Sequence, residues 1–144
     1  MSASALSQFM SAAATCTYSM LKSADYIQGE LPQLKVSEAM GEQIMDVCEH
    51  LVGTKHDVQT EISDLGELDA AVDSEVVQGR VRRIEAWLSE EIPRLHAVVT
   101  ALEPTGSVAY ILVAESVVNI MNSFREVRDA GDRYRAALRD PVSA

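Results

Sequence analysis

Three histidines are the residues of this sequence with the strongest potential for metal binding. His50, His56 and His96 each lack a glutamate three positions earlier, which the Glu-x-x-His motifs of di-iron helical bundles require. Asp46 precedes His50 by four residues, so these two side chains are neighbours on a helix. We interpret them as a hydrogen-bonded surface pair, and we predict no metal and no cofactor.

Nucleophilic chemistry by cysteine is weakly supported as well. Cys16 and Cys48 lie on or beside apolar stripes, which is typical of small core residues, and two thiols do not make a disulfide framework. No sequence signature around either cysteine brings a histidine base within reach of it. The chain also lacks a glycine-rich turn that leads into a helix and would cradle a phosphate. We predict no catalytic residues and a protein that is not an enzyme.

Carboxylates are the most unevenly distributed ionisable groups. Of the net charge of −10, residues 36–73 contribute −9, from ten acidic residues and one basic residue. At 100° per residue, most of these acids fall on one side of a helix, opposite its apolar residues. The predicted partner-binding residues on this acidic face are Glu38, Glu42, Asp46, Glu49, Asp57, Glu61 and Asp64.

Two interpretations of the acidic face remain open. It is the solvated side of an amphipathic helix, or it binds a basic partner, whose association it would accelerate. The face carries no cation that could offset its like-charge repulsion by i,i+4 pairing, although arginines at 80–83 and 125–139 offer an intramolecular alternative. The acidic balance argues against nucleic acid and membrane as ligands, because anionic ligands need a basic surface.

Apolar spacing predicts the helices that position these residues. Apolar positions recur at alternating steps of three and four, and glycine, proline and an N-capping serine (Ser37) separate the periodic segments. Pro93 falls inside the third segment, so we expect a kink or break near residue 92. The predicted helices of one single domain cover residues 4–28, 37–65, 74–102 and 107–139, to within a few residues.

Short connections place sequential helices side by side, so we predict an all-α fold, an antiparallel four-helix bundle. Scarce aromatics, 5% of the chain, indicate a core of small and medium side chains, which suits helix-on-helix packing. The alternatives are a three-helix bundle with a peripheral first helix and a bundle that is completed only by dimerisation.

The segment 105–124, TGSVAYILVAESVVNIMNSF, is the most apolar of the chain. Its uninterrupted apolar run, residues 108–114, is too short to cross a bilayer, which takes about 20 residues. Its apolar face is broader than the usual stripe of about 100°, which predicts either central packing or a homodimer interface. The residues of that dimer face are Tyr110, Ile111, Ala114, Val118 and Met121.

These patterns together predict a non-enzymatic protein-interaction module. An inhibitor of the antitoxin or immunity type, or a small chaperone, fits a compact acidic helical chain that binds a basic protein. A ligand- or metal-holding bundle and a structural subunit of an assembly are the alternatives, and the few polar residues on the inward seams favour the first prediction. The N-terminal segment lacks the basic stretch of a secretory signal, so we expect a cytoplasmic location.

Overall fold

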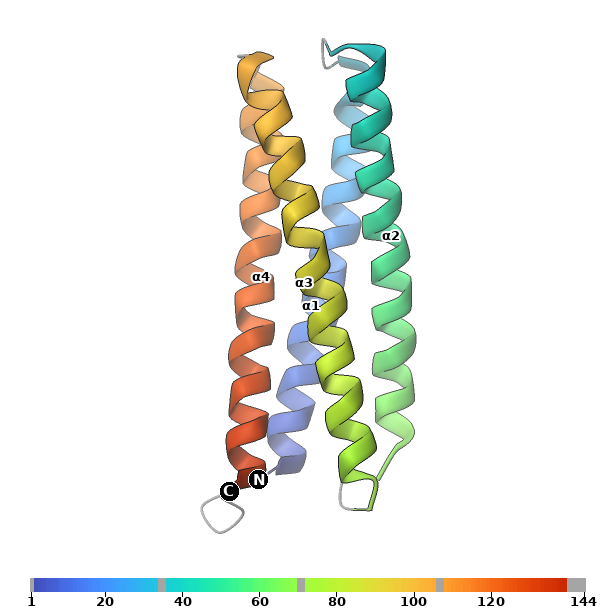
Figure 1. Cartoon of the computed structure of the whole chain (residues 1–144), viewed down its shortest axis with the longest axis vertical. Coiled ribbons are helices and arrows are strands. Elements are labelled where there is room, and N and C mark those ends of the chain that lie inside the picture. The colour runs from blue at the N-terminus through green and yellow to red at the C-terminus, as the bar shows by residue number, and fades with distance from the viewer. Residues whose placement is uncertain (1, 34–35, 70–71, 106–107, 140–144) are drawn as a thin grey trace.

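The computed structural model describes residues 2–33, 36–69, 72–105 and 108–139, which are almost entirely helical. The four long helices are α1 (Ser2–Glu30), α2 (Glu38–Glu67), α3 (Ser74–Leu102) and α4 (Val108–Arg139), as Figure 1 shows. Short 3-10 turns follow α1 and α3, at Leu31–Gln33 and Glu103–Thr105. The predicted all-α class is confirmed.

The helices form an antiparallel bundle in which each packs against its sequence neighbours, and α1 also packs against α4. The start of α1 and the end of α4 lie at the same end of the bundle as the end of α2 and the start of α3 (Figure 1). α1 makes the closest contacts, with α4 and α2, whereas α3 packs less closely against its two neighbours. The four-helix prediction is therefore confirmed, and the first helix is not peripheral.

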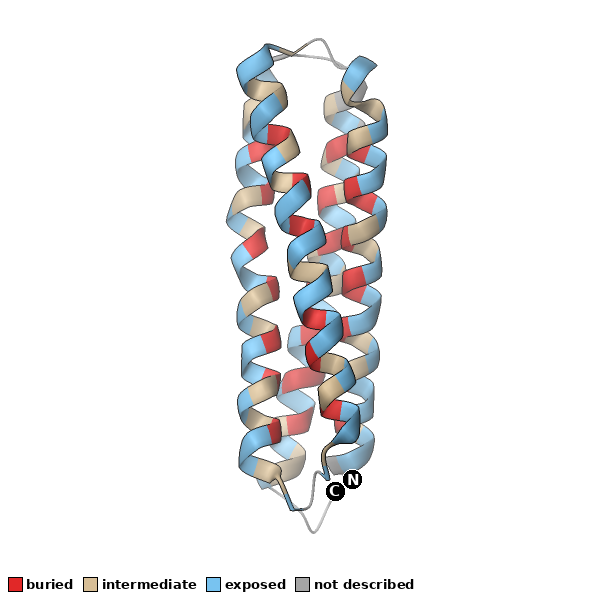
Figure 2. Cartoon of the chain, turned by 90° about the vertical axis from the view of Figure 1, so that its right-hand side faces the viewer, coloured by how far each residue is buried: buried red, intermediate tan, exposed pale blue. Residues whose placement is uncertain are grey.

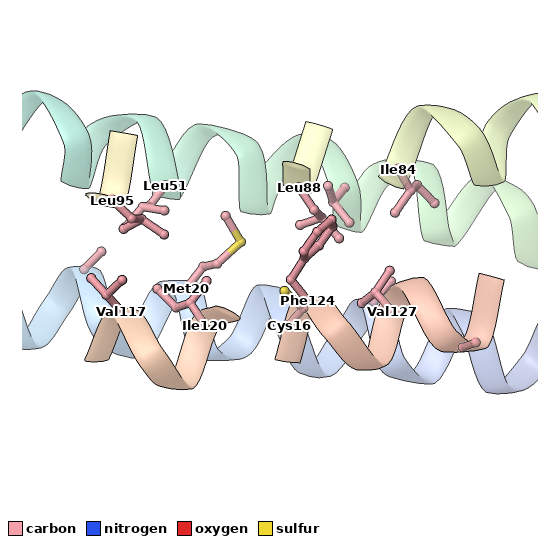
Figure 3. Packing of buried hydrophobic residues seen from close by; sticks show 14 of the residues in the cluster. Cys16, Met20, Leu51, Ile84, Leu88, Leu95, Val117, Ile120, Phe124 and Val127 are labelled. Atoms are coloured by element: carbon pink, nitrogen blue, oxygen red, sulfur yellow. The ribbon is translucent and has the colours of Figure 1, made fainter. Parts of the chain in front are cut away.

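Buried residues line the inward side of each helix, and exposed residues cover the outward side (Figure 2). Cys16 and Met20 of α1 and Phe124 of α4 point into an interior that side chains from all four helices share (Figure 3). α1 contributes small core residues such as Ala13 and Ala24, both fully buried, which let its neighbours approach closely. The core is thus filled with few aromatic rings.

α2, which carries the acidic face, begins at a defined cap. The Ser37 hydroxyl accepts a hydrogen bond from the Met40 backbone N–H over 3.2 Å, which satisfies one donor of the first turn. Glu38 lies in that turn, where a negative charge is stabilised by the helix dipole. The helix then runs without interruption through Gly53 to Glu67.

Pro93 does not break α3, which is one continuous helix from Ser74 to Leu102. Proline removes the hydrogen bond to the carbonyl four residues earlier, here that of Ser89. Pro93 and Ser89 are both exposed, so water can hydrate the carbonyl that lacks a donor. Hydration of the Ser89 carbonyl thereby replaces the backbone hydrogen bond that Pro93 removes.

Candidate functional site

Five carboxylates of the acidic face lie exposed along the N-terminal two-thirds of α2. They are Glu38, Glu42, Asp46, Glu49 and Asp57. None of them takes part in an ion pair with another described residue. We call these five residues the free acidic surface.

The other two predicted residues have a different environment. Glu61 is only 6% exposed, and its Oε1 accepts a hydrogen bond from Arg80 Nη1 over 3.1 Å, with Arg83 Nη1 at 3.7 Å. Asp64 Oδ2 lies 3.4 Å from the same Arg80 nitrogen. Arginines of α3 therefore neutralise the C-terminal end of the acidic face, and Glu61 is not available at the surface.

A groove with an apolar side runs beside the start of α2. Leu31, Val36 and Met45 line it, together with three residues of the free acidic surface, Glu38, Glu42 and Asp46. Charged and apolar groups are thus adjacent at this end of the bundle. Such a groove can take an apolar side chain while the carboxylates meet neighbouring cations.

A second, more polar hollow lies further along α2. It is lined by Asp46, Glu49, His50, Gly53, Thr54 and Asp57. Three of these residues belong to the free acidic surface, so the hollow extends that surface towards the middle of the helix.

His50 contacts an arginine rather than the predicted aspartate. Arg94 Nη1 of α3 lies 2.6 Å from His50 Nδ1, and among the described residues no hydrogen bond or ion pair joins His50 to Asp46. A guanidinium only donates hydrogen bonds, so His50 Nδ1 is the acceptor in this contact. Within the described ranges no group of three or more His, Cys, Asp or Glu residues is placed to hold a metal.

Both cysteines are free and buried. Burial raises the pKa of the Cys16 thiol from its ordinary value of 9.0 to about 12. Burial, reinforced by the nearby charge of Glu49, raises the pKa of Cys48 to about 11. Neither side chain supplies a thiolate at neutral pH, which nucleophilic attack would need.

Sequence reasoning missed Glu91, which is the most buried carboxylate among the described residues, at 2% exposure. Its Oε1 accepts hydrogen bonds from Thr54 Oγ1 of α2 over 2.6 Å and from Arg94 Nη1 over 3.3 Å. Its Oε2 is buried without a hydrogen-bond partner. The signal was present in the sequence, because the alternating steps of four and three that begin at Val77 reach Glu91, whereas Ile92 would require two successive steps of four.

Glu85 is a second interhelical carboxylate that the sequence did not reveal. Its two oxygens accept hydrogen bonds from Arg135 of α4 over 2.6 and 3.1 Å. Gly131 leaves the space for this pair, because a Cβ there would lie 2.6 Å from Glu85 Oε2. The glycine on the α4 seam is thus explained by a close approach from α3.

The predicted dimer face is divided between surface and core. Ile111 and Val118 are 55% and 52% exposed and lie seven residues apart, on one side of α4. Tyr110 and Met121 are half-buried against the core, and Ala114 is half-buried. None of the helices, as far as they are described, is long and apolar enough to cross a membrane.

Comparisons with protein-family models, with curated proteins and with solved structures give no match to this chain.

Proposed function

We propose that this chain is a non-enzymatic interaction module that binds a basic protein through the free acidic surface of α2. The observation that supports the proposal is the contrast along one helix. Glu61 and Asp64 are paired with α3 arginines, whereas Glu38, Glu42 and Asp46, with their neighbours, face solvent without a cation.

Unpaired like charges on one helix face repel one another and lower helix stability by a few tenths of a kcal/mol per i,i+4 pair. A basic partner would relieve this repulsion and would be steered towards the surface from a distance. The groove formed by Leu31, Val36 and Met45 adds apolar contact, which gives affinity that charge alone does not.

An inhibitor of the antitoxin or immunity type, or a small chaperone, is the class of module we propose. Both classes work by covering a surface of another protein, and neither requires a reactive group. The two free thiols are compatible with a reducing compartment such as the cytoplasm, where we place the interaction.

Charge reversal on α2 tests the proposal. We would immobilise the parent chain and a variant carrying Glu42→Lys, Asp46→Lys and Glu49→Lys, and quantify the proteins that each captures from a lysate of the source cells. The parent is expected to retain at least one basic protein that the variant loses. Thermal unfolding followed by circular dichroism should change little, since all three residues are exposed.

A matched control variant carries Glu75→Lys, Glu90→Lys and Glu126→Lys. These residues are exposed on α3 and α4 and take part in no ion pair with a described residue, so the change in net charge is the same on a different surface. The control should capture the partner as the parent does. Loss of the partner from both variants, or from neither, would refute binding through α2.

A further inference from the structure

The residues that join α3 to its neighbours differ in kind from those that join the other helices. Among the described residues, the side-chain hydrogen bonds and ion pairs between helices all involve α3, with the exception of the bond between Ser19 and Ser123. α1, by contrast, packs closely on α2 and α4 with Ala, Cys and Met side chains. α3 therefore adds polar interhelical contacts to its buried apolar residues, whereas α1 is held mainly by apolar contacts.

The α3 seam contains a carboxylate at a position that faces the core. Its buried positions follow steps of four and three without exception: Val77, Val81, Ile84, Leu88, Glu91, Leu95, Val98 and Leu102. On α2, Glu61 is likewise buried between Val58 and Leu65. Two core positions of the α2–α3 interface thus carry carboxylates, whereas the buried polar residues described on α1, Thr17 and Ser23, are uncharged.

Only one of the two carboxylate oxygens of Glu91 has hydrogen-bond partners. Thr54 and Arg94 both donate to Oε1, while Oε2 is buried without a partner. A buried polar atom without a hydrogen bond destabilises the state that buries it. Pro93, two residues further on, removes one backbone hydrogen bond from the same part of the helix.

We propose that α3 is the detachable helix of this bundle and leaves as a unit while α1, α2 and α4 stay packed together. Release lets water reach Glu91 Oε2, which reduces the cost of separating α3 from α2. It also uncovers inward apolar residues of α2 and α4, such as Leu51 and Phe124. The structure thereby contains a conformational device that makes an apolar surface available without global unfolding. The inference does not depend on the proposed partner.

Native-state hydrogen exchange in low concentrations of urea tests this device on the unmodified chain. Amides of residues 77–102 are expected to exchange through one shared open state. That open state should be at least tenfold more populated than the open state through which α1 amides exchange. If α1 and α3 amides exchange through a single global opening, the inference is wrong.

The substitution Glu91→Leu tests whether the buried Glu91 carboxylate favours the release of α3. Leucine fills a core position with an apolar side chain, and the freed Thr54 hydroxyl can bond within its own helix, as Thr60 does to the His56 carbonyl. The variant should slow α3 exchange at least tenfold relative to the parent and raise Tm by several degrees, about 4 °C or more. Faster α3 exchange, or a lower Tm, would overturn the proposal.

Glu90→Leu is the matched control, because Glu90 is the exposed neighbour on the same helix. It should leave α3 exchange within about twofold of the parent. Equal slowing in both variants would assign the effect to helix propensity and not to the buried carboxylate, and would also overturn the proposal. The exchange measurement on the parent chain remains decisive if a variant fails to fold.

Discussion

Glu61 and Glu91 show that a residue's place in the seam matters more for its environment than its chemical type. Each carboxylate lies at a buried position of its helix and is met by groups from the neighbouring helix, Arg80 for Glu61 and Thr54 for Glu91. The sequence predicted Glu61 for the exposed acidic face because, at 100° per residue, it falls with the other acids opposite the apolar residues of the helix. The pairing arginine lies 19 positions away, on the next helix, so only the register of α2 against α3 reveals it.

The cysteines give a prediction of pH dependence. The pKa of Cys16 is about 12 in the folded chain against an ordinary value of 9.0, so the unfolded state releases this proton first as the pH rises. Stability from this group is complete below about pH 9 and is lost between about pH 9 and pH 12. Between about pH 8 and about pH 10, the parent should lose about 1 kcal/mol more unfolding free energy than a Cys16→Ala variant.

Urea unfolding of both proteins at the two pH values measures this difference. Other groups that titrate in the same range, tyrosines included, are present in both proteins and cancel in the comparison. Parallel pH profiles would show that Cys16 ionises equally in the folded and unfolded states, contrary to its burial at 1% exposure.

At the scale of the helices, the heptad pattern predicted most of the arrangement but followed the wrong residue on α3. By apolar character alone Ile92 takes the seam position beside Pro93, but this choice requires two successive steps of four, from Ile84 to Leu88 and from Leu88 to Ile92. In the structure the seam keeps its regular steps through Glu91 and Val98, and Pro93 is exposed. Periodicity was therefore more informative than side-chain polarity at this position.

Pro93 also permits a stability prediction for α3. Replacing it with alanine supplies the N–H that the Ser89 carbonyl lacks, and the exposed site creates no cavity. Pro93→Ala should raise the unfolding free energy by about 1–3 kcal/mol, measured by urea unfolding. Pro104→Ala, in the 3-10 turn beyond α3, is the control and should have a much smaller effect. A lower unfolding free energy of Pro93→Ala would mean that the buried side chains of α3 need the proline in order to pack in the core.

At the scale of the whole molecule, the free acidic surface and the exposed pair Ile111 and Val118 lie on different helices. The free acidic surface is on α2, whereas Ile111 and Val118 are on α4, which packs against α1 and α3. We expect any pairing of two copies to use the α4 side, because the free acidic surfaces of two α2 helices would repel each other.

Sedimentation at tens of micromolar tests this expectation. If the parent dimerises, Val118→Asp should restore the monomer, since it places a charge inside the apolar contact. Val76→Asp, at a residue 50% exposed on α3, is the matched control and should leave association unchanged. A parent chain that sediments as a strict monomer removes the homodimer interface predicted for α4.

We propose binding of basic protein segments by the free acidic surface of α2. Its most direct test is a fluorescence anisotropy titration of a labelled amphipathic, lysine-rich helical peptide with the parent, the α2 reversal variant and the matched control. We predict that reversing Glu42, Asp46 and Glu49 weakens binding about tenfold or more, while the control stays within about threefold of the parent. Equal affinity of the parent and the α2 reversal variant for this peptide would contradict the claim.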